Sequence, residues 1–181
     1  MYNTNQHGFR SGRSCLSQLL SHYDEILSIL ETGNNADVIY LDFSKAFDKV
    51  DFNLVLAKIK DLGINGKIIK WIESFLKNRL QSVIVDGILS EPAPVISGVP
   101  QGSVLGPLIF LILIGDIDND ISNSSVRSFA DDTRLIRSIK NIEDTEALQE
   151  DLATVYNWTS VNNMKFNDIK FELLKYGTNN F

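Results

Sequence analysis

The amino-acid sequence predicts a single α+β domain, and three observations support that fold class. The chain has 181 residues, of which 44% are hydrophobic, enough for one sizeable core. Helical and strand-like apolar patterns follow one another without the regular strand–helix alternation of a doubly wound sheet. No repeat, low-complexity tract or linker interrupts them. We therefore expect helices packed on a sheet that is not doubly wound.

The first expected elements are a helix and a short strand. Apolar residues at spacings of three and four predict the helix, which should end at Gly33. The β-rich run Val38 to Leu41 predicts a buried strand that delivers Asp42 at its end. The helical stripe consists of Leu16, Leu19, Leu20, Tyr23, Ile26, Leu27 and Leu30.

The middle of the chain predicts helices, a hairpin and a loop. Two helices are expected at about residues 53–62 and 68–76, because apolar residues line one face of each. An Asp-Gly turn at Asp86–Gly87 should separate strands at Gln81–Asp86 and Pro94–Ile96. A Gly/Pro-containing loop then leads to an apolar helix that Ser103 is placed to cap.

The last part of the chain predicts a hairpin, a helix and a strand. Val126–Ala130 and Thr133–Ile136 flank two adjacent acids, so Asp131 and Asp132 are expected together at the hairpin tip. A helix at about residues 143–162 and a strand at Phe171–Tyr176 complete the expected fold.

Composition limits the classes of protein to which this chain can belong. The single cysteine, Cys15, excludes an intramolecular disulfide and a multi-cysteine zinc site, and it favours a reducing compartment. Met1 to Arg10 is polar and does not resemble a secretion signal. The apolar run Val104 to Ile114 is eleven residues long, whereas a membrane span needs about 20. We expect an intracellular protein of the nucleus or cytoplasm, neither secreted nor bound to a membrane.

The net charge of −6 is the opposite of the basic character expected of a nucleic-acid binder. Two explanations are open. Some of the acids could be metal ligands, whose charge Mg²⁺ would offset. Alternatively, the basic surface could belong to parts of a larger protein outside this sequence.

Three acids in unusual positions suggest a metal site. Asp42 follows a buried strand, and Asp131 and Asp132 lie between two strands, although acids are disfavoured in strands and cores. Carboxylates from adjacent strands can hold two Mg²⁺ ions about 3.5–4 Å apart, which promote an in-line displacement at phosphorus. The alternative is that these are ordinary turn and surface acids, because Asp is common in turns.

Four stretches of sequence surround these acids in a characteristic order. They read Gln6-His-Gly-Phe-Arg-Ser-Gly-Arg-Ser14, Leu41-Asp-Phe-Ser-Lys-Ala-Phe-Asp-Lys-Val-Asp51, Ser97-Gly-Val-Pro-Gln-Gly-Ser-Val-Leu-Gly-Pro107 and Phe129-Ala-Asp-Asp-Thr133. Together they resemble the reverse transcriptases of non-LTR retrotransposons, the long-interspersed-element type. The resemblance covers essentially the whole chain.

This resemblance implies a polymerase palm, a ferredoxin-like antiparallel sheet with packed helices. It places partial fingers at about residues 1–35 and mainly palm at about residues 36–181, in one domain fragment. It also implies that this fragment lacks the family's further fingers sequence before Gln6 and its thumb after about Tyr176. The resemblance also implies that Asp42, Asp131 and Asp132 are the catalytic, metal-binding triad, with the Phe43 backbone carbonyl beside the metal of the incoming nucleotide.

The resemblance assigns further residues to the nucleotide and the template. Each has an ordinary alternative: Phe47 could be a core aromatic, Gln101 and Gly102 a tight turn, and Lys170 a surface lysine. The resemblance implies that Phe47 excludes a 2′-hydroxyl, that Gln101 and Gly102 touch the nucleotide, and that Lys170 faces the triphosphate. Arg10 and Arg13 match a signature near template or phosphate, which guanidinium groups suit.

Two hypotheses for function follow. One is an RNA-directed DNA polymerase fragment that uses Mg²⁺, or Mn²⁺, an RNA template, a DNA primer and deoxynucleoside triphosphates. The other is a catalytically inactive retrotransposon-derived remnant that keeps the palm fold and acts at most as a binding or scaffold protein. A third possibility is a reverse transcriptase of the group II intron type or another cellular type, but the residues Asp42 to Asp48 favour the retrotransposon type.

Overall fold

The structure is a computed structural model, and it describes residues 5–177. The chain forms two compact units. Residues 47–114 form the second unit, and the first unit combines the segments before and after them. The fingers–palm boundary expected near residue 35 does not separate these units, because residues on both sides of it lie in the first. That boundary stays a prediction.

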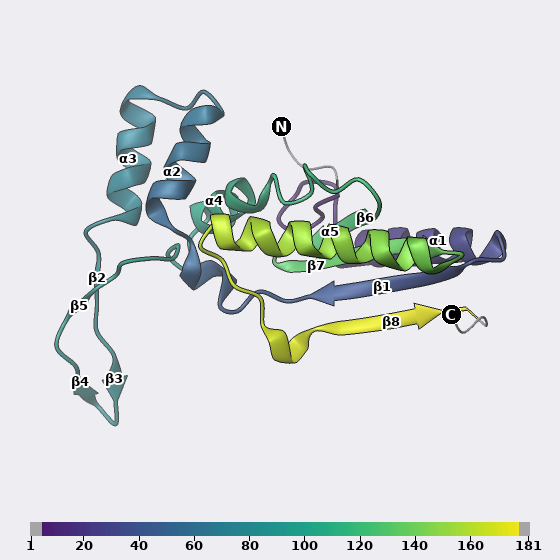
Figure 1. The fold of residues 1–181 in the computed structure, drawn as a ribbon. Coiled ribbons are helices and arrows are strands. Elements are labelled where there is room, and N and C mark those ends of the chain that lie inside the picture. The colour runs from purple at the N-terminus through teal and green to yellow at the C-terminus, as the bar shows by residue number, and fades with distance from the viewer. Residues whose placement is uncertain (1–4, 178–181) are drawn as a thin grey trace. The chain divides into compact units, whose positions relative to one another are not determined.

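The first unit is built on a four-stranded sheet (Figure 1). Its strands are β1 (Asn35–Leu41), β6 (Ser125–Phe129), β7 (Asp132–Ile139) and β8 (Glu172–Tyr176). The strand order is β6-β7-β1-β8, and every neighbouring pair is antiparallel. This is the strand order of a ferredoxin-like sheet, so the expected fold class is confirmed.

Two long helices pack against this sheet. Helix α1 (Cys15–Glu31) begins with a capping box, in which the side chains of Ser14 and Ser17 each accept a hydrogen bond from the other's backbone N–H. Ile26 of α1 packs on Val38 of β1 in a buried cluster. Helix α5 (Ile142–Val161) contacts β7.

The buried face of α1 agrees with the expected apolar stripe only in part, because the stripe residue Ile26 is buried but several of its leucines are exposed. The stripe residues Leu16, Leu20 and Leu27 are 64%, 62% and 57% exposed, whereas Gln18 and His22 are buried. His22 is accommodated because its Nε2 hydrogen-bonds the hydroxyl of Tyr40, 3.0 Å away, on the sheet.

The hairpin between β6 and β7 differs by one residue from the sequence prediction. Phe129 pairs with Asp132, so the two turn residues are Ala130 and Asp131, and Asp132 is the first residue of β7. Ala130 adopts a φ of 54°, which allows the chain to reverse within two residues. The expectation that both acids occupy the tip was therefore wrong for Asp132.

The second unit consists of helices with a small two-stranded extension. A 3₁₀ turn (Ala46–Lys49) leads into it, followed by α2 (Phe52–Asp61), α3 (Gly66–Leu76) and α4 (Leu105–Ile114). Helix α2 packs against both α3 and α4. As expected, Ser103 caps α4, since its hydroxyl accepts from the Gly106 N–H at 3.0 Å.

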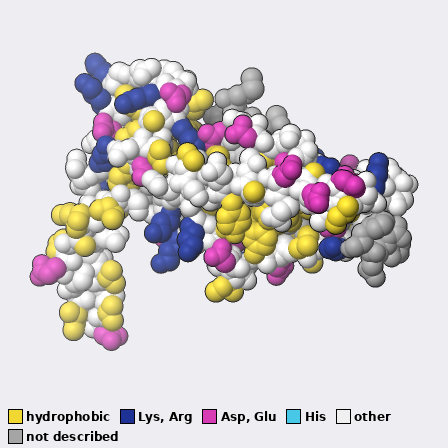
Figure 2. All heavy atoms as spheres, in the orientation of Figure 1, with side chains coloured by type: hydrophobic (Ala, Val, Ile, Leu, Met, Phe, Trp, Pro, Cys, Tyr) yellow, Lys and Arg dark blue, Asp and Glu magenta, His cyan; other side chains and the backbone are white. Residues whose placement is uncertain are grey.

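The extension contains the expected Asp-Gly turn, but the strand after the turn begins at Ile88 and not at Pro94, so the expected Pro94–Ile96 strand was misplaced. β3 (Ile84–Val85) pairs with β4 (Ile88–Leu89) around Asp86 and Gly87, whose φ angles are 50° and 80°. β2 (Leu80–Gln81) pairs with β5 (Ala93–Pro94). Figure 2 shows hydrophobic side chains gathered on the surface of this hairpin, where Ile84 and Ile88 are 68% and 76% exposed.

No helix within residues 5–177 is both long enough and apolar enough to cross a membrane.

Candidate active site

Asp42 lies directly after the last residue of β1. Alternation along the strand places its side chain on the same face as Val38, the face covered by α1. Its backbone carbonyl accepts from the Asn167 N–H at 2.8 Å, which ties the strand end to the segment before β8. The Asp42 side chain remains 24% exposed, so it is accessible to a ligand.

The hairpin acids lie on the neighbouring strand. Leu41 pairs with Thr133, so the next step of the same register brings Asp42 opposite Asp132. Asp131 occupies the turn beside them and is half-buried. The structure thus brings together the three acids that the sequence singled out, at one end of two adjacent antiparallel strands.

The three carboxylates influence one another electrostatically. Burial raises the pKa of Asp131, and the negative charges of Asp132 and Asp42 raise it further. A backbone hydrogen bond and the ammonium of Lys170 act in the opposite direction. Negative charge is therefore concentrated at this end of the sheet, and a cation there would relieve the repulsion.

Lys170 supplies one such positive charge. It ends the short 3₁₀ helix η2 (Asp168–Lys170), and its Nζ lies 3.1 Å from Oδ2 of Asp42. The Lys170 side chain is 63% exposed, so this ion pair is a solvated contact that a ligand can replace. The structure places Lys170 beside the acids, and its predicted role at the triphosphate stays a prediction.

The side chain of Phe43 anchors the end of β1 on the sheet face opposite to that of Asp42. Its buried ring stacks on Phe166 with centroids 4.6 Å apart and meets Trp158 of α5 edge-on. The backbone bridge between Phe43 and Phe166 is made by Asp42 O and Ser44 N. Neither bond uses the Phe43 carbonyl, so the carbonyl predicted to meet a metal is not consumed by this bridge.

The predicted nucleotide residues Phe47, Gln101 and Gly102 all lie in the second unit. There the loop that carries Gln101 and Gly102 is hydrogen-bonded to the segment that begins at Phe47. The Phe47 carbonyl accepts from the Val99 N–H at 2.9 Å, and Gln101 Nε2 donates to Oδ1 of Asp48 at 2.8 Å. Sequence reasoning gave Asp48 no direct contact with the loop.

Gly98 explains how closely the loop approaches residues 47–50. Its φ is +86°, and a Cβ at this position would lie 2.8 Å from the backbone of Asp48. Gly102 is different, because a Cβ there would meet nothing within 4 Å, although its φ of +79° still favours glycine. The loop therefore keeps an open backbone surface at Gly102.

The comparison with known proteins decides the family. Residues 1–179 match the family described as reverse transcriptase (RNA-dependent DNA polymerase). The chain belongs to the reverse transcriptase family.

Relatives of this reverse transcriptase chain come from mobile elements. The RNA-directed DNA polymerases of mobile element jockey from Drosophila funebris and Drosophila melanogaster are 33% and 32% identical to it over 170 residues. That alignment covers 90% of this chain and 18% of each relative, so the chain spans about a fifth of their length. The probable RNA-directed DNA polymerase from transposon BS of Drosophila melanogaster is 30% identical over 84% of the chain and covers 18% of that relative. The resemblance to non-LTR retrotransposons is confirmed.

Solved structures show the same fold. Apo telomerase from Candida tropicalis, truncated from the C-terminal domain, matches with a TM-score of 0.67 at 15% identity, over 98% of this chain and 37% of that one. Telomerase from Candida albicans, in complex with the TWJ fragment of telomeric RNA, matches with a TM-score of 0.68 at 12% identity, over 94% and 32%. These likenesses confirm a polymerase palm-like fold.

Reverse transcriptases generally use divalent metal ions, and the acids of this chain fit such ions in kind. Asp42, Asp131 and Asp132 offer only oxygen donors, which Mg²⁺ prefers. Among the residues that the structure describes, however, no group of three or more His, Cys, Asp or Glu side chains is arranged to hold an ion. The remaining ligands in such sites normally come from water and substrate phosphates.

The two arginines assigned to template or phosphate lie on the loop before α1. Arg10 NH1 donates to the carbonyl of Gln6 at 3.2 Å, and Arg13 NH1 lies 3.3 Å from Nε2 of His7. Burial lowers the pKa of His7, and the neighbouring arginines lower it further. Because a guanidinium only donates, Nε2 of His7 is the acceptor in the contact with Arg13. Both arginines thus brace their own loop, and their contact with nucleic acid stays a prediction.

Gln6 and Gly8 contact the β6–β7 hairpin of this reverse transcriptase domain, and sequence reasoning missed both. The Gln6 amide hydrogen-bonds the backbone of Ala130, and Gly8 lies against the Ala130 nitrogen. The only signal in the sequence was their place in the first of the four stretches. Local spacing could not reveal a partner 124 residues away.

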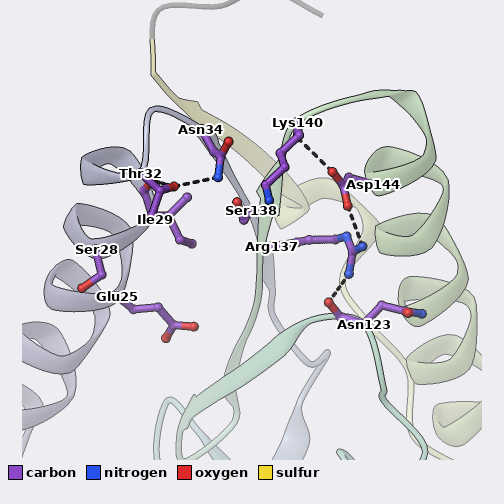
Figure 3. A pocket seen from close by; sticks show the side chains of 10 residues that line it. All are labelled: Glu25, Ser28, Ile29, Thr32, Asn34, Asn123, Arg137, Ser138, Lys140 and Asp144. Carbon is purple, nitrogen blue, oxygen red and sulfur yellow. Dashed lines mark hydrogen bonds and ion pairs between the residues drawn. The ribbon is translucent and has the colours of Figure 1, made fainter.

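A separate cavity of about 460 Å³ lies between α1, β7 and the start of α5 (Figure 3). Arg137 crosses it, donating to the Asn123 carbonyl and to Asp144. This cavity lies near the Ile139 end of β7, seven residues from Asp132, or roughly 20 Å along an extended strand. It is therefore distinct from the acid site.

Proposed function

We propose that this chain is the catalytic portion of an RNA-directed DNA polymerase, which joins deoxynucleotides to a primer 3′-hydroxyl. The observation that carries the proposal is the meeting of Asp42 with Asp131 and Asp132 at one end of two adjacent strands. Membership of the reverse transcriptase family supports the same assignment. Because the chain spans about a fifth of the length of its relatives, the activity of the whole protein is part of the proposal.

The acids would bind two divalent ions, Mg²⁺ or Mn²⁺. When bound, such ions activate the attacking hydroxyl and stabilise the leaving oxygen of an in-line displacement. The residues of this chain supply the negative charge that attracts them, because the carboxylates of Asp132 and Asp42 lie close enough to Asp131 to raise its pKa. The exposed ion pair between Lys170 and Asp42 would open to admit a ligand.

An RNA template, a DNA primer and deoxynucleoside triphosphates would be the partners. A telomerase of the same fold is in complex with an RNA fragment, which supports nucleic acid as the partner class. Phe47, Gln101 and Gly102 would contact the nucleotide, and Arg10 and Arg13 would contact template or phosphate. We also propose an intracellular location, in the nucleus or cytoplasm.

Primer extension on an RNA template tests the proposal. The wild-type chain, with Mg²⁺ and deoxynucleoside triphosphates, is compared with Asp131→Asn. The variant should lose about 100-fold or more in rate, because stabilisation of transition-state charge worth several kcal/mol is removed. Asp86→Asn is a matched control, since it makes the same chemical change in the turn of another hairpin.

The results of primer extension either support or contradict the polymerase function. Extension that Asp131→Asn abolishes and Asp86→Asn preserves supports the polymerase. Extension that persists in Asp131→Asn contradicts it.

A second candidate is a palm-fold protein that binds or scaffolds without catalysis. It is favoured by the absence, among residues 5–177, of any group of acids arranged to hold an ion. Titration with Mn²⁺ distinguishes the two functions. Only the polymerase requires that the chain bind Mn²⁺ and that Asp131→Asn weaken this binding.

A further inference from the structure

We propose that Gln6 is a positioning residue, whose side-chain amide holds the Ala130–Asp131 turn in the conformation that presents Asp131. This inference rests on the proposed function, because it concerns the acid that the polymerase would use. Gln6 does not touch the reacting groups itself. It acts through the backbone of Ala130, the residue immediately before Asp131.

The Gln6 amide makes three hydrogen bonds. Its Nε2 donates to the Ala130 carbonyl at 3.0 Å, and its Oε1 accepts from the Ala130 N–H at 2.7 Å. The same Oε1 accepts from the Gly8 N–H at 2.7 Å. Only this orientation of the amide satisfies two donors and one acceptor, so the nitrogen and oxygen positions are fixed by their partners.

Ala130 needs this support because its backbone is unfavourable for an alanine. A φ of 54° lies in the left-handed region, which costs an L-residue roughly 1–2 kcal/mol. Ala130 is also 7% exposed, so its N–H and C=O would be costly to leave without partners. The Gln6 amide satisfies both groups, as a neighbouring strand would, and stabilises the strained turn.

Gln6 is itself held rigidly beside the hairpin. It is 5% exposed and forms a parallel bridge with Ser128 of β6. The His7 N–H donates to the Ser128 carbonyl at 2.9 Å, and the Ser128 N–H donates to the Asn5 carbonyl at 3.0 Å. The segment around Gln6 therefore extends the sheet edge up to the turn, which gives the amide a fixed base.

The chemistry of the contact is specific to glutamine. A primary amide offers a donor and an acceptor side by side, which matches the N–H and C=O of one residue. Methionine has a similar length but neither group. Asparagine keeps both groups on a side chain shorter by one methylene, so it cannot reach Ala130 from the same backbone position.

The chain contains a matched control in Gln18. This second glutamine is also buried, at 4% exposed, but it lies on α1. Its Nε2 has no hydrogen-bond partner within the described residues. Replacing Gln18 therefore perturbs a buried glutamine near the same end of the chain without removing the hydrogen bonds that Gln6 makes to Ala130.

The experiment compares wild type, Gln6→Met, Gln6→Asn and Gln18→Met in the full chain. Amide hydrogen exchange of Ala130, measured by NMR, reports on the turn directly. Mn²⁺ titration, followed by electron paramagnetic resonance, reports on the acids without any primer or nucleotide. We expect Gln6→Met to speed Ala130 exchange about tenfold and to weaken Mn²⁺ binding about tenfold or more. Gln6→Asn should shift both in the same direction, and Gln18→Met should leave both unchanged.

Two results would overturn the inference. In the first, both Gln6 variants keep wild-type Ala130 exchange and Mn²⁺ affinity. In the second, Gln18→Met weakens Mn²⁺ binding as much as Gln6→Met, which would make the effect a general loss of stability. A wild-type chain that extends no primer contradicts the proposed polymerase instead, whereas Ala130 exchange and Mn²⁺ affinity still decide the role of Gln6.

Discussion

Replacing Gly8 by alanine tests how rigidly the Ala130–Asp131 turn is held. The φ of Gly8 lies outside the left-handed region, so alanine would meet no backbone strain there. The effect comes from contact alone. A Cβ at Gly8 would lie 2.3 Å from the nitrogen of Ala130 and 2.9 Å from its Cα, both backbone atoms that cannot rotate away.

The size of the effect follows from these distances. Ordinary van der Waals contact begins at 3.4 Å, so the turn and the segment carrying Gly8 must separate by about 1.1 Å. Such overpacking costs about 1–3 kcal/mol, or about 2–12 °C in Tm for a chain of this size. A displacement of about 1 Å beside Asp131 should lower the rate of primer extension about 100-fold.

The assay combines primer extension with thermal unfolding. Gly63→Ala is the control, because a Cβ there meets nothing within 4 Å and its φ of +84° imposes only backbone strain. That strain costs roughly 1–2 kcal/mol, so the two variants should lose similar stability. Primer extension by Gly8→Ala should fall by more than the loss of folded protein explains, whereas primer extension by Gly63→Ala should fall only in proportion to that loss.

Two outcomes would refute this reasoning. Full extension and an unchanged Tm in Gly8→Ala would show that the close approach to Ala130 is not required. Equal losses of activity in Gly8→Ala and Gly63→Ala would show that stability, and not the position of the turn, controls the rate.

Three further predictions concern stability and charge. Asp151→Asn should lower the free energy of unfolding by about 2 kcal/mol in urea denaturation, because the buried carboxylate accepts from the Asn123 N–H at 3.0 Å. Burial raises the pKa of Asp37 above 3.8, although a lysine ammonium partly offsets this, so its ionisation opposes folding. Asp37→Asn should therefore gain stability relative to wild type as pH rises from 3.8 through the raised pKa, in denaturation at several pH values. Lys170→Ala should change Tm little, since exposed ion pairs such as that with Asp42 contribute about 0–1 kcal/mol, but should slow primer extension.

Each of these predictions has a contrary result. Glu150→Gln, an exposed acid one residue from Asp151, should be neutral, and an equal loss from both would point to general helix effects. A stability difference for Asp37→Asn that is the same at pH 3 and pH 7 would show that its charge does not oppose folding. Wild-type extension by Lys170→Ala would remove that residue from the site.

Local sequence patterns were enough to predict most of the elements. Apolar spacing predicted α1, α2 and α5 to within a residue or two, and Asp86–Gly87 predicted the β3–β4 turn, because helix periodicity and turn preferences depend on neighbouring residues. The same reasoning predicted Asp42 at a strand end and the acid pair at a hairpin, which is most of the candidate site.

The sequence revealed only part of the buried face of α1, which includes Ile26 of the expected stripe. The leucine stripe predicted an amphipathic helix, yet Leu16 and Leu20 are exposed while Gln18 and His22 face the protein. Spacing identifies the faces of a helix but not their partners. The buried face depends on the sheet that α1 packs against, because Tyr40 on the sheet provides the hydrogen bond that allows His22 to be buried.

The exact turn of the β6–β7 hairpin also depended on tertiary structure. Pattern alone placed both acids at the tip, whereas the folded chain assigns Asp132 to β7 and leaves Asp131 in the turn. The difference arises because Ala130 adopts a positive φ that its own residue type disfavours. A hydrogen-bonding amide from Gln6, 124 residues earlier in the chain, stabilises that conformation, and only folding brings the two together.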